Sequence, residues 1–350
     1  MAKTPHRPVI AVTMGDPAGV GPELCLRVLR DASVLAECIP LVFGDAGVML
    51  RVAGYCGLAK PECVVNVKEW GRRPGDQGPA VIDFRNIDAA QVRPGEVQAA
   101  CGQAAYEYVE EAVKRALAGE AAAIATAPIH KEAIRWAGIE QPGHTEILAA
   151  LTGSPRVCMM LASEELIVSM VTTHIGFAEV PKRLSVARVL EVIELTAEAA
   201  GQLKGSTPRI GVCGLNPHSG EGGLFGNREE EQIIEPAIAA ARGKRIQAEG
   251  PIPPDTAFVP QRRRQFDAIV CMYHDQGHIP FKMLAFDTGV NITLGLPIVR
   301  VSVDHGTAFD IAWTGRASPR SMIQAVLWSA RLARAKQARQ GGSVVSDNLR

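Results

Sequence analysis

Short apolar runs rich in β-branched residues alternate with longer segments of helical period along this chain. Apolar runs without polar alternation are typical of strands that are buried on both faces of a parallel sheet. The sequence predicts seven such strands: Val9–Thr13, Leu41–Phe43, Ala122–Thr126, Leu166–Thr173, Arg209–Gly214, Ala268–Met272 and Ile298–Val303.

The segments between these runs carry the pattern of amphipathic helices. Glu96–Ala118 places its apolar residues on one face and stops at Gly119. Ser185–Leu203 begins with a capping serine, and Ser318–Arg334 begins with a serine followed by a proline suited to the first helical position. The alternation of strands and helices predicts an α/β fold. We expect the polar tail, residues 336–350, to be flexible.

Composition excludes several classes of protein. The 350 residues include 37 Lys+Arg and 37 Asp+Glu, which gives a formal net charge of zero. Binding to nucleic acid in general, or to a membrane surface, requires a basic excess, so neither partner is predicted. No uncharged apolar stretch approaches the ~20 residues that span a bilayer. The eight cysteines form no C-x-x-C pair, which favours reduced, buried thiols in a cytoplasmic protein.

Five histidines follow shortly after predicted strands. They are His130, His174, His218, His274 and His305. Ligands of open α/β sheets bind outside the carboxyl ends of the strands, so we expect these side chains to converge on one cleft. Three histidines from separate strands would suit a catalytic metal with open positions for substrate. The alternative is that each is an ordinary structural or surface histidine.

Candidate contacts for an anion lie in four other places. His144 and Thr145 follow a glycine at a predicted helix N-terminus, which suits phosphate, although a plain capping turn is the alternative. Arg300 lies within an apolar strand and needs a partner from the protein or a ligand. Lys282 and Asn291 are either ordinary loop residues or substrate contacts.

The usual nucleotide motifs are incomplete. The G-x-G pairs at Gly19/Gly21 and Gly220/Gly222 lack the third glycine of G-x-G-x-x-G, and the sequence contains no P-loop. A dinucleotide would therefore be bound by other means than a Rossmann motif.

Eight segments together resemble the 4-hydroxythreonine-4-phosphate dehydrogenase family of vitamin B6 biosynthesis. They span nearly the whole chain and are Thr13–Glu23, Ala127–Lys131, Pro142–Glu146, Gly214–Gly223, Pro254–Phe258, Tyr273–Gly277, Val290–Pro297 and Asp304–Ala308. The resemblance implies a homodimer with the active site at the subunit interface. It also implies two α/β/α lobes around a cleft, as in isocitrate and isopropylmalate dehydrogenases. We place the first lobe at residues 1–125 plus 290–335 and the second, with the metal and substrate residues, at 126–289.

The same resemblance implies roles for particular residues. The ligands of one divalent metal ion (zinc, magnesium, cobalt or manganese) fall on His174, His218 and His274, one of them supplied by the partner subunit. Substrate contacts fall on His144, Thr145, Lys282, Asn291 and Arg300, and catalytic roles on Lys282, Asp275 and Asp255. The loop that binds NAD or NADP falls on His305, Gly306, Thr307, Ala308 and Asp310.

The implied reaction is a metal-assisted oxidation. The metal lowers the pKa of the secondary hydroxyl of 4-phosphohydroxy-L-threonine, and hydride passes to NAD. The ketone then loses CO2 to give 3-amino-2-oxopropyl phosphate, with Lys282 or Asp275 relaying protons. Three alternatives remain: oxidation of D-threonate or D-erythronate 4-phosphate, oxidation of an aromatic cis-dihydrodiol, and a catalytically silent metabolite-binding protein.

Overall fold

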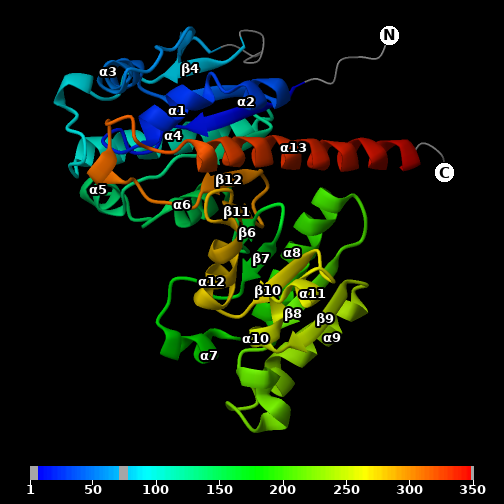
Figure 1. The fold of residues 1–350 in the computed structure, drawn as a ribbon. Helices are drawn as coiled ribbons and strands as arrows, with labels where there is room; N and C mark the ends of the chain where they lie inside the picture. The colour runs from blue at the N-terminus through cyan, green and yellow to red at the C-terminus, as the bar shows by residue number, and fades with distance from the viewer. Residues whose placement is uncertain (1–6, 71–77, 348–350) are drawn as a thin grey trace. The chain divides into compact units, whose positions relative to one another are not determined.

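The computed structural model describes residues 7–70 and 78–347, with side chains as far as residue 338. Contacts divide the chain into two compact units. Unit 1 comprises residues 1–155 and 296–337, and unit 2 comprises residues 156–295 together with 338–350. In Figure 1 the blue and cyan N-terminal segments share unit 1 with the orange and red C-terminal segments, while unit 2 is mainly green and yellow.

Unit 1 contains a parallel sheet. Its strands lie in the order β3 (Val64–Asn66), β4 (Ala80–Asp83), β2 (Ile39–Gly44), β1 (Val9–Thr13), β5 (Ala123–Thr126) and β12 (Arg300–Val303). Every pair of neighbours in this order is parallel. The carboxyl ends of β1, β5 and β12 therefore lie at one edge of the sheet, as expected for a site at strand ends.

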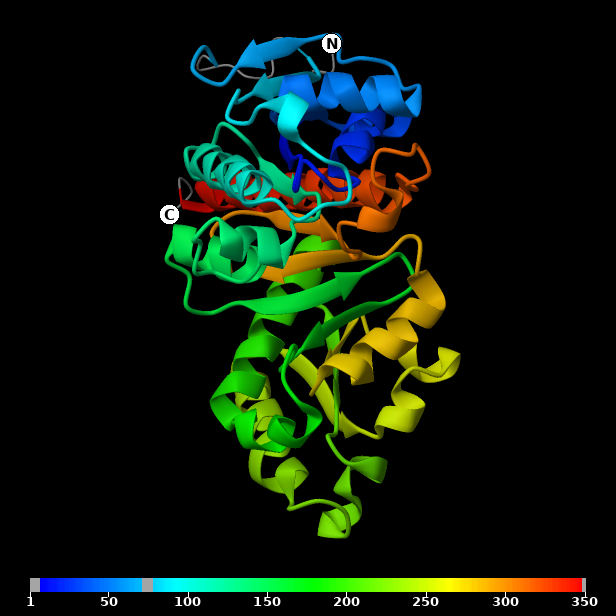
Figure 2. The same cartoon turned by 90° about the vertical axis from the view of Figure 1, so that its left-hand side faces the viewer.

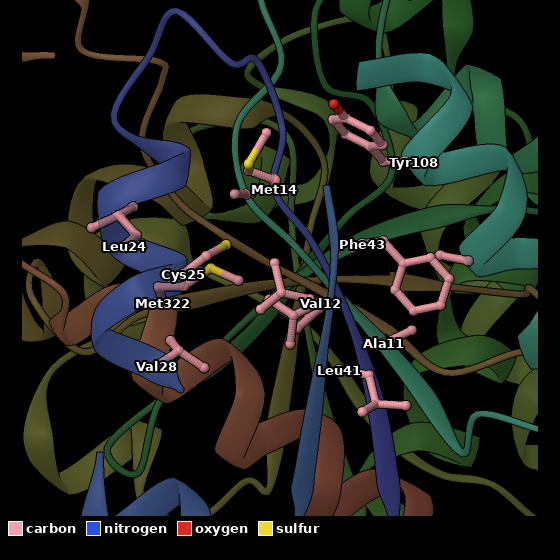
Figure 3. Close-up of a cluster of buried hydrophobic side chains, with 14 of the residues drawn as sticks. Ala11, Val12, Met14, Leu24, Cys25, Val28, Leu41, Phe43, Tyr108 and Met322 are labelled. Carbon is pink, nitrogen blue, oxygen red and sulfur yellow. The ribbon is translucent and has the colours of Figure 1, made fainter. Parts of the chain in front are cut away.

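Helices cover both faces of this sheet. They are α1 (Gly21–Val28), α2 (Ala32–Glu37), α3 (Ala46–Cys56), α4 (Ala99–Leu117), α5 (Lys131–Trp136), α6 (His144–Thr152) and α13 (Arg320–Asp347), the last assigned to this unit up to Gln337. Figure 3 shows Leu24 of α1 and Met322 of α13 on one side of β1, with Tyr108 of α4 on the other. All three side chains are fully buried. The helical stripe predicted over Glu96–Ala118 thus contributes to the core.

Unit 2 contains a mixed sheet. Its strand order is β11 (Val290–Leu294), β6 (Cys158–Ala162), β7 (Ile167–Met170), β10 (Ala268–Cys271), β8 (Arg209–Cys213) and β9 (Gln247–Ile252). β6 runs antiparallel to both of its neighbours, whereas β7, β10, β8 and β9 are parallel. The parallel group places the ends of β7, β10 and β8 side by side.

The helices of unit 2 lie on opposite sides of its sheet. They are α7 (Val180–Arg183), α8 (Val186–Lys204), α9 (Glu235–Gly243), α10 (Pro254–Ala257), α11 (Pro260–Arg263) and α12 (His274–Ala285). α12 packs against β7 and β10, and α8 packs against β10 and β8 from the other face (Figure 2). Ser185 caps α8 as predicted, because its Oγ accepts a hydrogen bond from Arg188 N at 3.2 Å.

The unit boundaries differ from those predicted. Residues 126–155 belong to unit 1, because α5 packs on α4 and the side chains of Ile147 and Leu148 join the core of that unit. Residues 290–295 belong to unit 2, because β11 pairs with β6.

Helix α13 extends beyond the predicted end at Arg334, as far as Asp347. Alanine, lysine, glutamine and arginine favour helix over residues 335–340. The predicted flexibility of residues 336–350 stays a prediction. Residues 348–350 lie outside the described part of the chain. Between residues 7 and 347, apart from 71–77, no helix is long and apolar enough to cross a membrane.

Candidate active site

Three histidine loops follow three neighbouring strands of unit 2. His174 follows β7, His274 follows β10 and His218 follows β8. β10 lies between β7 and β8 and is parallel to both. The loops therefore leave the same edge of the sheet.

His174 and His274 approach each other. Their ring centroids are 5.7 Å apart. Nδ1 of His274 lies 2.7 Å from Oδ1 of Asp275, and the ring of His274 stacks on that of His278 at 3.6 Å. A carboxylate bound to Nδ1 fixes the tautomer and leaves Nε2 as the donor to a metal, the arrangement found around ligating histidines. These two imidazoles are donors of a type that divalent transition metals accept, and Asp275 contacts one of them.

His218 lies in an unusual turn, Pro217–Gly223. His218, Ser219 and Glu221 have φ values of 52°, 53° and 43°, in the left-handed region that is unfavourable for residues with a Cβ. The His218 ring is exposed, with Nδ1 3.3 Å from Oε2 of Glu221. Such backbone persists only when surrounding contacts impose it, and it is common in ligand-binding loops.

The described part of the chain contains no group of three His, Cys, Asp or Glu side chains arranged to hold a metal ion. The structure therefore brings His174 and His274 together without completing a three-histidine site. Soft-to-borderline imidazole donors of this kind suit zinc and other divalent transition metals.

Unit 1 contains a buried cationic site, the Arg300 corner, which consists of Arg300, His144 and Thr145. Arg300 on β12 is 2% exposed and donates from Nη2 to Oγ1 of Thr126 at 2.7 Å. Burial lowers the pKa of Arg300 to about 9, while Glu146 raises it. The guanidinium is therefore charged at neutral pH, as an anion site requires.

His144 lies beside this guanidinium. Burial and then the charge of Arg300 lower the pKa of His144 well below its usual value, so the imidazole is neutral. Its Nε2 is buried and has no hydrogen-bond partner among the described residues. His144 and Thr145 open α6, whose N-cap, Gly143, provides no side-chain cap. The helix N-terminus and Arg300 both favour a negative charge here.

The predicted cofactor loop follows β12 in the same unit. The amide of Val20 donates to the carbonyl of Thr307 at 3.0 Å, and the ring of Phe309 stacks on His130 with centroids 4.6 Å apart. Gly306 has open space where a Cβ would lie. Contacts at Thr307 and Phe309 thus anchor the loop to neighbouring segments. The free space at Gly306 lets a ligand approach the backbone there.

The remaining predicted residues lie on separate elements of unit 2. Lys282 is on α12, with Nζ 5.7 Å from the Phe286 ring. Asn291 is partly buried on β11, and Asp255 is exposed on α10. Their catalytic and binding roles stay predictions.

Sequence reasoning missed three buried polar residues near these loops. Asp16 is fully buried behind β1, and burial raises the pKa of its carboxyl to about 7. Gln276 and Glu230 are buried beneath the histidine loops. Asp16 and Gln276 lie inside segments that carry the family resemblance. That position is the one signal that could have identified them.

Helix α12 also presents an apolar face to solvent in the single chain. Ile279 and Met283 of the helix, and Phe286 at its C-cap, are spaced by four and three residues and are 58%, 82% and 74% exposed. This α12 face begins one turn after His274. Large exposed apolar side chains in a row are typical of protein interfaces.

Comparisons with known proteins identify the family of this chain. The family model "Pyridoxal phosphate biosynthetic protein PdxA" matches residues 36–329. A 4-hydroxythreonine-4-phosphate dehydrogenase of Desulforapulum autotrophicum is 47% identical over 93% of this chain and 96% of its own length. A D-threonate 4-phosphate dehydrogenase of Cupriavidus necator is 45% identical over 94% of this chain and 98% of its own.

A solved structure of a relative has the same fold as this chain. The 4-hydroxythreonine-4-phosphate dehydrogenase of Klebsiella pneumoniae superposes with a TM-score of 0.84 and 42% identity, covering 93% of this chain and 99% of that one. The predicted α/β fold of the isocitrate and isopropylmalate dehydrogenase type is confirmed. The chain belongs to the PdxA family of pyridoxal phosphate biosynthetic proteins, whose named members are dehydrogenases.

Proposed function

We propose that this chain oxidises 4-phosphohydroxy-L-threonine at its secondary hydroxyl with NAD and a divalent metal ion. The ketone then loses CO2 to leave 3-amino-2-oxopropyl phosphate. The observation that carries the proposal is the buried Arg300, held against Thr126 and beside a neutral His144 at the start of α6. Because the family consists of dehydrogenases, we assign this corner to binding the anionic group of a phosphorylated substrate.

The corner binds an anion through three kinds of donor. Arg300 contributes a charged guanidinium, which forms strong, directional hydrogen bonds to phosphate or carboxylate. His144 contributes Nε2, buried and without a partner among the described residues, and Thr145 contributes a hydroxyl. Because His144 is neutral, it donates or accepts a hydrogen bond without adding charge.

The histidines of unit 2 would hold the metal. His174 and His274 lie together, and Asp275 orients His274 so that Nε2 is available. When bound, a divalent ion supplies Lewis acidity that lowers the pKa of the substrate hydroxyl and stabilises the enolate. Lys282 relays the proton in this proposal, and Asp255 stays a predicted acidic residue of the site.

The loop after β12 would position NAD. This loop is formed by His305, Gly306, Thr307, Ala308 and Asp310, and contacts at Thr307 and Phe309 hold it to neighbouring segments. A preformed loop loses less conformational entropy when it binds a ligand.

A second copy of this chain would complete the site. The three histidines are not gathered in one chain, and the exposed α12 face begins one turn after His274. We propose a homodimer that buries Ile279, Met283 and Phe286 and brings the third metal ligand from the partner. All eight cysteines are free, as in proteins of the reducing cytoplasm, where we place this enzyme.

A second candidate substrate is D-threonate 4-phosphate. The Cupriavidus relative with that name is nearly as similar to this chain as the Desulforapulum relative, and one anion corner serves either substrate. Steady-state NADH formation should be compared for 4-phosphohydroxy-L-threonine, D-threonate 4-phosphate and D-erythronate 4-phosphate. The proposal expects the highest kcat/KM with the first. A preference for either sugar-acid phosphate would establish the second candidate. Oxidation of none would favour a cis-dihydrodiol dehydrogenase or a silent binding protein.

A further inference from the structure

The three histidine loops of unit 2 are connected beneath their imidazoles by buried hydrogen bonds. Thr172, two residues before His174, donates from Oγ1 to the carbonyl of Met272 at 2.8 Å. Its amide donates to the same carbonyl at 3.2 Å. Met272 itself lies two residues before His274. The loop of His174 is therefore fixed to the loop of His274.

Gln276 makes the next connection. Its side chain is 7% exposed. Its Oε1 accepts from the amide of Met272 at 2.6 Å, and its Nε2 donates to the carbonyl of Gly214 at 2.8 Å. Gly214 opens the segment that carries His218. One buried amide group thus joins the loop of His274 to the loop of His218.

Glu230 fixes the segment just before His218. Its Oε1 accepts from the amides of Leu215 at 2.9 Å and Asn216 at 2.7 Å, and its Oε2 accepts from Nδ2 of Asn216 at 2.9 Å. A Cβ on Gly220 would lie 2.7 Å from Oε2 of Glu230. The carboxylate therefore also packs directly under the left-handed turn.

We propose that Gln276 is a positioning residue for the metal site, with Glu230 as its support under His218. This inference rests on the proposed role of the three histidines as metal ligands. Gln276 contacts backbone rather than metal or substrate, so it acts by keeping two ligand-bearing loops in register. Residues that orient metal ligands in this way typically change metal affinity by about 10- to 100-fold when mutated.

The variant Gln276→Glu tests this role with little change in shape. When the carboxyl is ionised, one oxygen still accepts from Met272 N, but the other faces the carbonyl of Gly214 and no longer donates. Titration of the metal-free, full-length protein with Co2+, followed by visible absorption, measures both affinity and ligand geometry. We expect Co2+ affinity to fall by about 10- to 100-fold and the absorption bands to shift. Gln232→Glu, an exposed substitution in the same unit, is the matched control and should leave both unchanged.

A second variant covers the case in which Gln276→Glu fails to fold. Gln276→Met keeps the length of the side chain and removes both hydrogen bonds without adding a charge. It should weaken Co2+ binding in the same range, with faster amide exchange at Met272, whose N–H loses its acceptor. Unchanged Co2+ affinity and spectrum in a folded Gln276 variant would overturn this inference alone. Absence of Co2+ binding by the unmodified chain would overturn the proposed metal site and this inference with it.

Discussion

At the residue scale, burial decides the charge of the groups near the candidate site. Three of these groups lie in unit 1: Arg300 begins β12, His144 begins α6, and Asp16 follows β1. Arg300 stays charged, while His144 is neutral because burial and Arg300 disfavour its protonated form. The sequence predicted that Arg300 needs a partner, and Thr126 is one. Asp16 could not be recognised as buried, because its burial depends on loops that are distant in sequence.

Asp16 should make stability depend on pH. Burial raises the pKa of its carboxyl to about 7, so the folded chain keeps a proton that the unfolded chain releases near the ordinary value of 3.8. The contribution of this group to the free energy of unfolding is therefore full below about pH 4 and falls as pH rises to about 7, by up to about 4 kcal/mol. Urea unfolding of the parent protein and Asp16→Asn between pH 5 and 8 measures this difference. The variant should gain relative stability as pH rises, and parallel curves would contradict the assignment.

Arg300 should be intolerant of lysine. The Arg300→Lys variant retains a charge but loses the planar group that donates to Thr126 while holding an anion. Loss of one charged hydrogen bond is worth about 1.5–3 kcal/mol, so kcat/KM for the phosphorylated substrate should fall roughly 10- to 100-fold. The exposed Arg316→Lys serves as control. Equal kinetics for Arg300→Lys and the parent protein would exclude a role in binding the anion.

At the element scale, the apolar pattern identified the central strands and missed several others. All seven predicted runs contain or overlap strands, namely β1, β2, β5, β7, β8, β10 and β12. β3 has only three residues, and β9 contains Gly250 and Pro251, so neither has the pattern of a buried strand. β6 and β11 were also missed, and they form the antiparallel part of unit 2. β6 is an apolar run without β-branched residues, and β11 alternates apolar and polar positions, so neither has the pattern of the predicted strands.

The cap of α8 gives a prediction for a single element. Ser185 accepts from Arg188 N and so satisfies one of the amides left free at the start of the helix. Ser185→Ala should lower the free energy of unfolding by about 1 kcal/mol. Ser206→Ala, at an exposed position shortly after the same helix, should have little effect. Thermal or urea unfolding of both variants measures the difference, and equal stabilities would show that the cap is not stabilising.

At the scale of the whole molecule, the family resemblance predicted more about fold and function than the local sequence patterns did. It identified the fold type and the enzyme class, which the comparisons confirm. It also listed the site residues, and the structure groups Arg300 with His144 and His174 with His274. The loop supports at Gln276 and Glu230 were not predicted, because a buried polar side chain and its backbone partners become neighbours only in the folded chain. For Gln276, its place in a segment that carries the resemblance was the one available signal.

A shared active site should allow complementation between inactive variants. If one metal ligand comes from the partner subunit, a mixed dimer of two different histidine variants contains one site with both substitutions and one intact site. The His174→Ala, His218→Ala and His274→Ala chains should be mixed in pairs after unfolding and refolding together. Two of the three pairings should restore NADH formation. The third, which combines the two variants whose ligands come from the same subunit of a site, should not. Failure of every pairing, with mixed dimers present, would contradict the shared site.

The central claim is that a metal held by histidines assists oxidation by NAD. The most direct measurement is NADH formation from 4-phosphohydroxy-L-threonine by the parent protein and His218→Ala, together with the metal content of each. We expect the variant to lose bound metal and its rate to fall by more than about 100-fold, beyond the effect typical of residues that only orient ligands. Loss of the metal with NAD reduction unaffected would contradict the account.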